Sequence, residues 1–151
     1  MQIFRASQRD APTRQGRRAA PSGFSLLLDE QSPGSILRLR GMIEDTIGKI
    51  EARIQGADSI KEERRQELLE LLATLKSEVS RLPAKHDEQA QSIARFAEIS
   101  THEATRSQQN PDLLNLSLKG LNSSVEGFEQ SHPRLVQIVN TISHTLSNLG
   151  I

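Results

Sequence analysis

Four histidines are the side chains of this sequence best suited to catalysis or metal binding, because the chain contains no Cys, Trp or Tyr. The absence of Cys excludes disulfides, thiolate metal sites and cysteine nucleophiles. A di-metal site in a helical bundle needs two Glu-x-x-His pairs and further inward-facing Glu residues, whereas this sequence has a single such pair, Glu129 and His132. We therefore expect no metal and no cofactor. The histidines, which we interpret as structural or exposed side chains, are His86, His102, His132 and His144.

No motif for nucleophilic or phosphate chemistry accompanies the histidines. The sequence has no G-x-S-x-G elbow, no Walker loop and no G-x-G-x-x-G fingerprint. We therefore predict that the protein is not an enzyme and has no small-molecule substrate.

From Met42 onward the spacing of apolar residues predicts helices and no strands. A first stripe advances in steps of four and three residues, as one face of a helix requires: Ile43, Ile47, Ile50 and Ile54. A second stripe has the same spacing and ends at Pro83: Leu68, Leu72, Leu75, Val79 and Leu82. The short connection after Gly56 predicts an antiparallel hairpin. Asp58 or Ser59 is the expected cap of the second helix, and Ser59 with Glu62 has the spacing of a capping box.

A third helix is expected over residues 85–106, with a thinner apolar face. That face comprises Ala90, Ile93, Phe96, Ala97 and Ile99. Asn110 followed by Pro111 is a favourable start for another helix, since Asn caps free N–H groups and Pro lacks one.

The C-terminal part carries the clearest helical pattern. Its stripe comprises Leu114, Leu118, Leu121, Val125 and Phe128, and then Leu135, Val139, Ile142, Leu146 and Leu149. Phe128 and Leu135 are seven residues apart, so the heptad phase continues across Pro133, which favours a kinked pair of helices over a sharp reversal. Both arrangements belong to the same expected fold class, an all-α bundle of coiled-coil-like hairpins over residues 42–151.

Residues 1–41 differ in composition from the rest of the chain. They hold seven Arg against three acidic residues and show no sustained period. Such a segment is typical of a disordered basic tail, and an arm that neutralises phosphates is the functional alternative. A further hypothesis is that translation starts at Met42, in which case residues 1–41 are not part of the native protein.

The last helix is depleted of charge. No Asp, Glu, Lys or Arg follows Arg134, and charge depletion is a property of interface centres. We therefore predict that this helix meets another chain through Leu135, Val136, Val139, Ile142, Leu146 and Leu149. The alternative is that the other helices of the same chain cover it.

Three segments resemble an uncharacterised bacterial family of short helical proteins. They are the Phe-Glu-Gln-Ser-His-Pro run of residues 128–133, the Leu-Gly-Ile ending, and the Glu-rich leucine helix of residues 67–72. The resemblance implies a bacterial, cytoplasmic protein and supplies no activity. Its motif residues are Phe128, Glu129, Ser131, His132 and Pro133. Physically, Ser131 is suited to cap the last helix, Pro133 to its first turn, and the His132 ring to a free carbonyl of the preceding helix.

The sequence thus favours a non-enzymatic interaction or structural protein, a homo-oligomer or the binder of a partner helix. A peripheral membrane or apolar-surface binder, using the C-terminal amphipathic helices, is the alternative. Nucleic acid is not an expected partner unless the Arg-rich tail is translated.

Overall fold

The computed structural model describes residues 33–149, and the helical prediction is confirmed there. The described chain has five α-helices, one short 3-10 helix and no strand. These are α3 (Pro33–Gly56), α4 (Glu62–Ser80), η1 (Ala84–His86), α5 (Asp87–Ala104), α6 (Pro111–Ser123) and α7 (Pro133–Leu149). Most of the predicted basic tail lies outside the described residues. The chain divides into two units, Met1–Arg38 and Leu39–Ile151, and the bundle belongs to the second.

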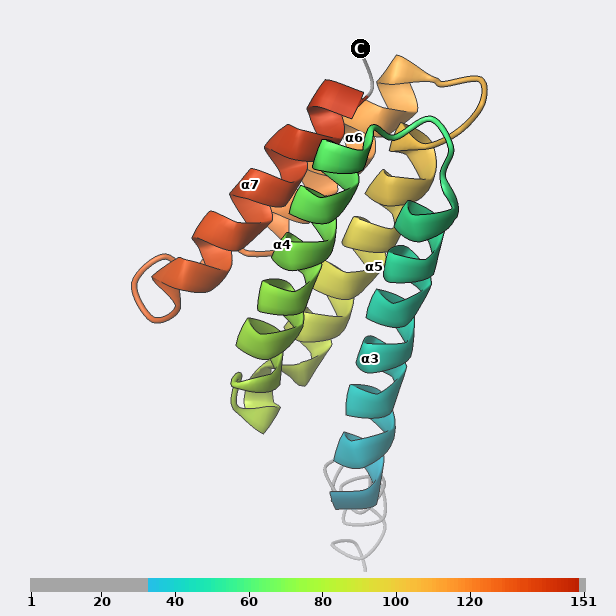
Figure 1. Cartoon of the computed structure of the whole chain (residues 1–151). Helices are drawn as coiled ribbons and strands as arrows, with labels where there is room; N and C mark the ends of the chain where they lie inside the picture. Colours follow the sequence, from blue (N-terminus) through green and yellow to red (C-terminus); the bar gives the residue numbers. More distant parts are fainter. Residues whose placement is uncertain (1–32, 150–151) are drawn as a thin grey trace, which may run out of the picture. The chain divides into compact units, whose positions relative to one another are not determined.

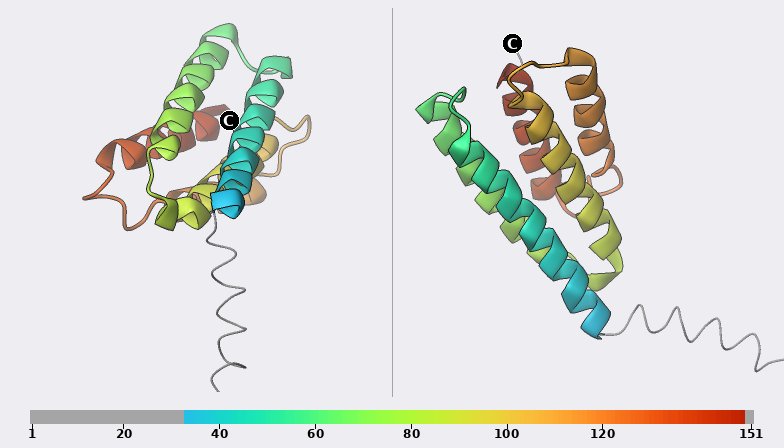
Figure 2. Two further views of the ribbon diagram at one scale, coloured as in Figure 1. Left: turned by 90° about the horizontal axis from the view of Figure 1, so that it is seen from below. Right: turned by 90° about the vertical axis from the view of Figure 1, so that its right-hand side faces the viewer.

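Successive helices of the second unit run in alternating directions (Figure 1 and Figure 2). The packed pairs are α4 with α7, α6 with α7, α5 with α6, and α5 with α7. Helix α7 therefore packs against three other helices.

The core consists of the stripes that the spacing predicts. Each stripe of the two N-terminal helices is buried from its first to its last residue, from Ile43 to Ile54 and from Leu68 to Leu82. The C-terminal stripe is also buried from Leu114 to Phe128 and from Leu135 to Leu146. The 3.6-residue period is therefore a correct guide to which side of each of these helices faces inward.

Helix α3 begins at Pro33, so the predicted boundary at Met42 falls inside a helix. Arg40 attaches this part of α3 to the end of α4 and to α5. Its guanidinium donates to the carbonyl oxygens of Ser80 (3.1 Å) and Leu82 (2.6 Å) and lies 3.0 Å from Oδ1 of Asp87. A C-terminal helix end leaves carbonyls without partners, so one side chain serves that end and also pairs with one oxygen of a buried carboxylate, whose Oδ2 has no hydrogen-bond partner among the described residues.

The turn between α3 and α4 is held by an arginine, and the predicted Ser59 cap is wrong. The residue preceding α4 is Lys61, which makes no side-chain cap bond. Instead, Arg65 donates to the carbonyls of Ile54 (3.2 Å), Ala57 (2.7 Å) and Ile60 (3.2 Å). Glu62 accepts bonds from Gln66 and Arg65, and these bonds lower the pKa of its carboxyl.

The α6–α7 connection reverses the chain, so the favoured kink is wrong. Helices α6 and α7 pack side by side, and the Ser143 hydroxyl donates to Oδ1 of Asn122 (2.9 Å). Gln109, just before α6, donates to the carbonyl of Leu149 at the end of α7 (3.3 Å). The heptad phase continues across this turn because both helices bury one stripe, and it carries no information on their relative direction.

We predict that Leu72→Asp unfolds the protein whereas Glu70→Ala leaves its stability nearly unchanged. Leu72 is only 1% exposed, and an unpaired buried carboxylate costs several kcal/mol, roughly the whole stability of a small domain. Glu70 is exposed on the opposite side of α4. Chemical denaturation monitored by circular dichroism measures the difference, and equal midpoints would contradict the assigned inner face.

Arg40→Ala is expected to destabilise the fold by about 1–3 kcal/mol, because Asp87 then keeps a buried charge without its partner. The Asp87 side chain is 6% exposed. Lys49→Ala, at an exposed site on the same helix, is the control and should change little. In a double-mutant cycle, Arg40→Ala combined with Asp87→Ala should cost less than the sum of the single changes; additivity would disprove the coupling.

Candidate interaction surfaces

The predicted interface on α7 is mostly used inside the chain. Leu135, Val139, Ile142 and Leu146 are buried among the chain's own helices, while Val136 and Leu149 are partly buried against the same core. Four of the six residues are therefore covered by helices of the same chain, which is the alternative that the sequence left open. The heptad stripe marks the side that is buried, and nothing in it says which chain covers that side.

The outer side of α7 is polar and carries no charge after Arg134. A shallow groove there is lined by Glu129, Pro133, Val136, Gln137, Asn140, Thr141 and His144. Helix α4 flanks α7 through Glu78, whose carboxylate lies 3.4 Å from Nε of Arg134. Amide, hydroxyl and imidazole groups make up most of the lining of this groove, and only Pro133 and Val136 are apolar.

The Ser-His-Pro motif forms part of a cluster of three rings. His86 from η1, Phe128 and His132 lie edge to face, with centroids 5.1 Å (His86–Phe128), 5.5 Å (Phe128–His132) and 6.2 Å (His86–His132) apart. Phe128 is buried, and edge-to-face packing of this kind stabilises aromatic clusters. The structure therefore joins the turn after α6 to the segment between α4 and α5.

The backbone of this turn is organised by Gly127 and Glu129. Gly127 has a φ of +94°, and its N–H donates to the Glu129 carboxylate (2.8 Å). Ser131 hydrogen-bonds the neighbouring His132 ring (3.0 Å), and the His132 N–H donates to the Phe128 carbonyl (2.8 Å). The sequence predicts that the His132 ring bonds a carbonyl of the preceding helix; instead the backbone N–H of His132 makes that kind of bond, and the ring pairs with the Ser131 hydroxyl.

A different surface holds exposed apolar side chains. Five large apolar residues are exposed among those the structure describes, and four of them lie on α5 and α6: Phe96, Ile99, Leu113 and Leu116. We call these four residues the α5–α6 face. The predicted buried face of α5 includes Phe96 and Ile99, which is wrong because both side chains are exposed. Leu113 and Leu116 belong to none of the predicted stripes.

Phe96 lies across Gly120, and this contact joins the two helices of the α5–α6 face. A Cβ added at Gly120 would collide with the Phe96 ring. The glycine therefore leaves the space that the ring occupies. The sequence does indicate part of this exposed face, because Leu113 and Leu116 are apolar although they lie outside the buried stripe of residues 114, 118 and 121.

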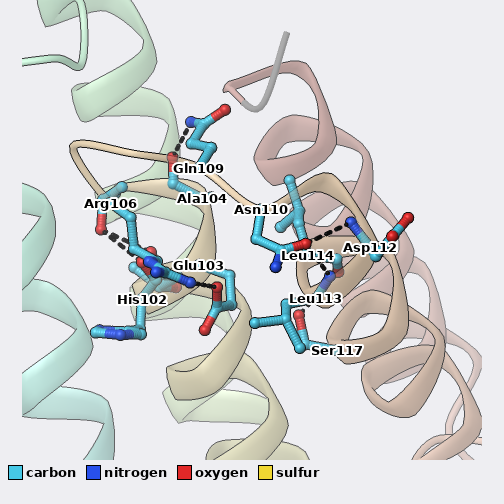
Figure 3. Close-up of polar contacts among 12 residues, drawn as sticks. His102, Glu103, Ala104, Arg106, Gln109, Asn110, Asp112, Leu113, Leu114 and Ser117 are labelled. Atoms are coloured by element: carbon cyan, nitrogen blue, oxygen red, sulfur yellow. Dashed lines mark hydrogen bonds and ion pairs between the residues drawn. The ribbon is translucent and has the colours of Figure 1, made fainter.

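The turn between α5 and α6 fixes the start of α6 (Figure 3). Asn110 accepts hydrogen bonds from the N–H groups of Asp112 (3.0 Å) and Leu113 (3.2 Å), which confirms the predicted cap. Gln109 donates to the carbonyl of Ala104 (2.7 Å). The first turn of α6, which carries Leu113, is thereby held in place by the loop as well as by packing.

Between residues 33 and 149, no three His, Asp or Glu side chains gather in a way that could hold a metal ion. None of the helices in that range combines the length and the apolarity that crossing a bilayer requires.

We predict opposite effects for alanine at two glycines. Gly127→Ala should destabilise the protein by about 1–2 kcal/mol, because an L side chain is strained at positive φ. Gly48→Ala, inside α3 where a Cβ meets nothing within 4 Å, should stabilise it by up to about 1 kcal/mol through helix propensity. Thermal unfolding of both variants provides the test, and shifts of the same sign would contradict the turn geometry.

Comparison with known proteins finds one family. No curated protein and no solved structure matches the chain. A family model described as a domain of unknown function, DUF4404, matches residues 68–151. This match begins within α4, includes the α5–α6 face and the Ser-His-Pro turn, and covers more than half of the chain. The chain therefore belongs to the DUF4404 family.

Proposed function

We propose that the protein is a non-enzymatic interaction protein whose α5–α6 face binds a helix, supplied by a second copy or by another protein. The observation that carries the proposal is the gathering of Phe96, Ile99, Leu113 and Leu116 on two adjacent helices. Single exposed apolar residues are normal on protein surfaces, whereas a contiguous group is typical of a binding site.

The composition of the α5–α6 face fits a helix as ligand. Leu116 is 66% exposed, and Leu113 precedes it by three residues on the same side of α6. Two parallel ridges of apolar side chains, one on each helix, present a surface for the apolar face of an amphipathic helix. Exposed charged residues at the edge, Asp112 and Lys119, provide the polar rim that interfaces usually have.

The α7 surface is the weaker candidate for the same function. Pro133 and Val136 are the apolar residues that line its outer groove. The other lining residues carry amide, hydroxyl or imidazole groups, except Glu129, which carries a carboxylate. The proposal also includes what the sequence and the family resemblance predict: a bacterial, cytoplasmic protein with coiled-coil-like packing that forms a homo-oligomer.

Membrane or apolar-surface binding is the second candidate function. The four exposed residues of the α5–α6 face are better placed than α7 to contact such a surface. The apolar stripe of α7 faces the core and would reach a lipid surface only if the bundle opened. The cations on the outer part of α5 and α6, such as Arg95 and Lys119, are few, so attraction to anionic lipid is weak.

Site-specific photo-crosslinking in cells tests the proposal. A photoreactive phenylalanine analogue placed at Leu116 in the full chain should form protein adducts in high yield, because this position lies inside the proposed interface. The same analogue at Asn140, an exposed position on the outer side of α7, reports the surface predicted from the sequence alone.

The adducts distinguish the candidates. Protein adducts at position 116 well above those at position 140 support the α5–α6 face, and the reverse pattern contradicts it. Flotation of the wild-type chain with phosphatidylcholine–phosphatidylglycerol vesicles, together with loss of flotation in Leu116→Ser and no protein adduct at 116, would establish the membrane alternative instead.

A further inference from the structure

The outer side of α6 carries opposite charges around an apolar centre. Asp112 and Lys119 are both exposed and seven residues apart, which places them on the same side of the helix at a separation of two turns. Leu116 lies midway between them and is the most exposed large apolar residue that the structure describes. Read in either direction along α6, this side thus presents a charge, a leucine and a charge of the other sign.

We propose that a second copy of this chain is the occupant of the α5–α6 face, with the two α6 helices packed antiparallel about a two-fold axis next to Leu116. The inference rests on the proposed function and names its partner. In a two-fold interface residue i of one protomer contacts residue j of the other, and j contacts i. Asp112 then lies opposite the partner's Lys119, and Lys119 opposite the partner's Asp112, so two ion pairs form by one symmetry operation.

The same placement buries the apolar side chains. Leu113 and Leu116 lie toward the α5 side of α6, where Phe96 rests on Gly120. A partner helix laid along this side therefore covers Phe96 and Ile99 of α5 together with the two leucines. Apolar contact supplies the affinity, and the charges at either end fix the direction of the helices.

Other occupants fit the charges less well. A parallel pair of α6 helices would place Asp112 opposite the partner's Asp112 and Lys119 opposite the partner's Lys119, which is repulsive. A lipid surface would have to cover or skirt both charged side chains beside Leu116, and desolvating an unpaired charge is costly. The antiparallel second copy pairs both charges and buries all four apolar residues.

A single cysteine provides the geometric test, since the sequence contains none. Packed helices have axes about 8–10 Å apart and Cα atoms about 2.3 Å from the axis, so residues facing each other at a two-fold axis lie within disulfide reach. Leu116→Cys in the full chain should therefore give a disulfide-linked dimer on mild oxidation. Asn140→Cys, exposed on α7, is the matched control and should remain largely monomeric at equal concentration.

Charge exchange provides the test of direction. Asp112→Lys and Lys119→Asp should each weaken dimerisation about fivefold to tenfold in sedimentation equilibrium, because each turns two attractive pairs into two repulsive ones. The double variant regenerates both pairs and should return to within about threefold of the wild type. Asp112 also lies in the first turn of α6, where a negative charge favours the helix; the double variant keeps that loss, so recovery of the dimer cannot arise from restored helix stability.

The outcomes test two claims separately: that the α5–α6 face binds a helix, and that this helix belongs to a second copy of the chain. A wild-type dimer that Leu116→Cys does not cross-link, or whose affinity the double variant does not recover, overturns the two-fold arrangement while leaving helix binding in place. A purified chain that is monomeric throughout the micromolar range, combined with adducts to other proteins at position 116 in cells, overturns the second copy as partner. Absence of adducts at position 116 overturns the proposed function itself.

Discussion

The burial of one stripe of α7 is the constraint on which the rest of the bundle depends. Leu135, Val139 and Leu146 are fully enclosed, and α4, α5 and α6 each pack against the helix that carries them. Helices α4, α5 and α6 must therefore present apolar side chains along the whole length of the α7 stripe. The ion pair of Arg134 with Glu78 and the bond of Ser143 with Asn122 then fix its rotation from either side.

Periodicity predicted the inner faces of four helices because each stripe is local in sequence and its period is a property of the helix alone. The direction of α7 relative to α6 depends instead on the backbone between them. Gly127, at positive φ, and the Glu129 carboxylate that accepts its N–H shape that turn, and neither belongs to the stripe. The two predicted caps had different outcomes. Asn110 accepts from the first N–H groups of α6 as predicted, whereas α4 has no side-chain cap and the turn before it is held by Arg65, which donates to the carbonyls of that turn.

The error on α5 has a cause in side-chain size. Its inner face is built from Ala90, Ala94, Ala97 and Ala104 with Ile93, and small side chains allow neighbouring helices to approach closely. A sequence interpretation that looks for large apolar residues assigns Phe96 and Ile99 to the interior, although the alanines already fill it. On α7 the large residues of the predicted interface are in the chain's own core, because large apolar residues and missing charges mark a buried helix whether its neighbours belong to the same chain or to another.

Close packing of α5 on α6 also explains why bulky residues stand at the rim, but it does not explain why they are apolar. Once Phe96 lies over Gly120, the flanking positions 99, 113 and 116 point away from the core and are open to any polar side chain. Leu116 is 66% exposed. Lys or Gln at this position would stabilise the helix of a single protomer about as well, because their helix propensities are similar to that of leucine. Exposed apolar residues stabilise a protein only when they are removed from water. In the proposed dimer, α6 of the second copy covers these residues, and its own Asp112 and Lys119 pair with the opposite charges of the first copy.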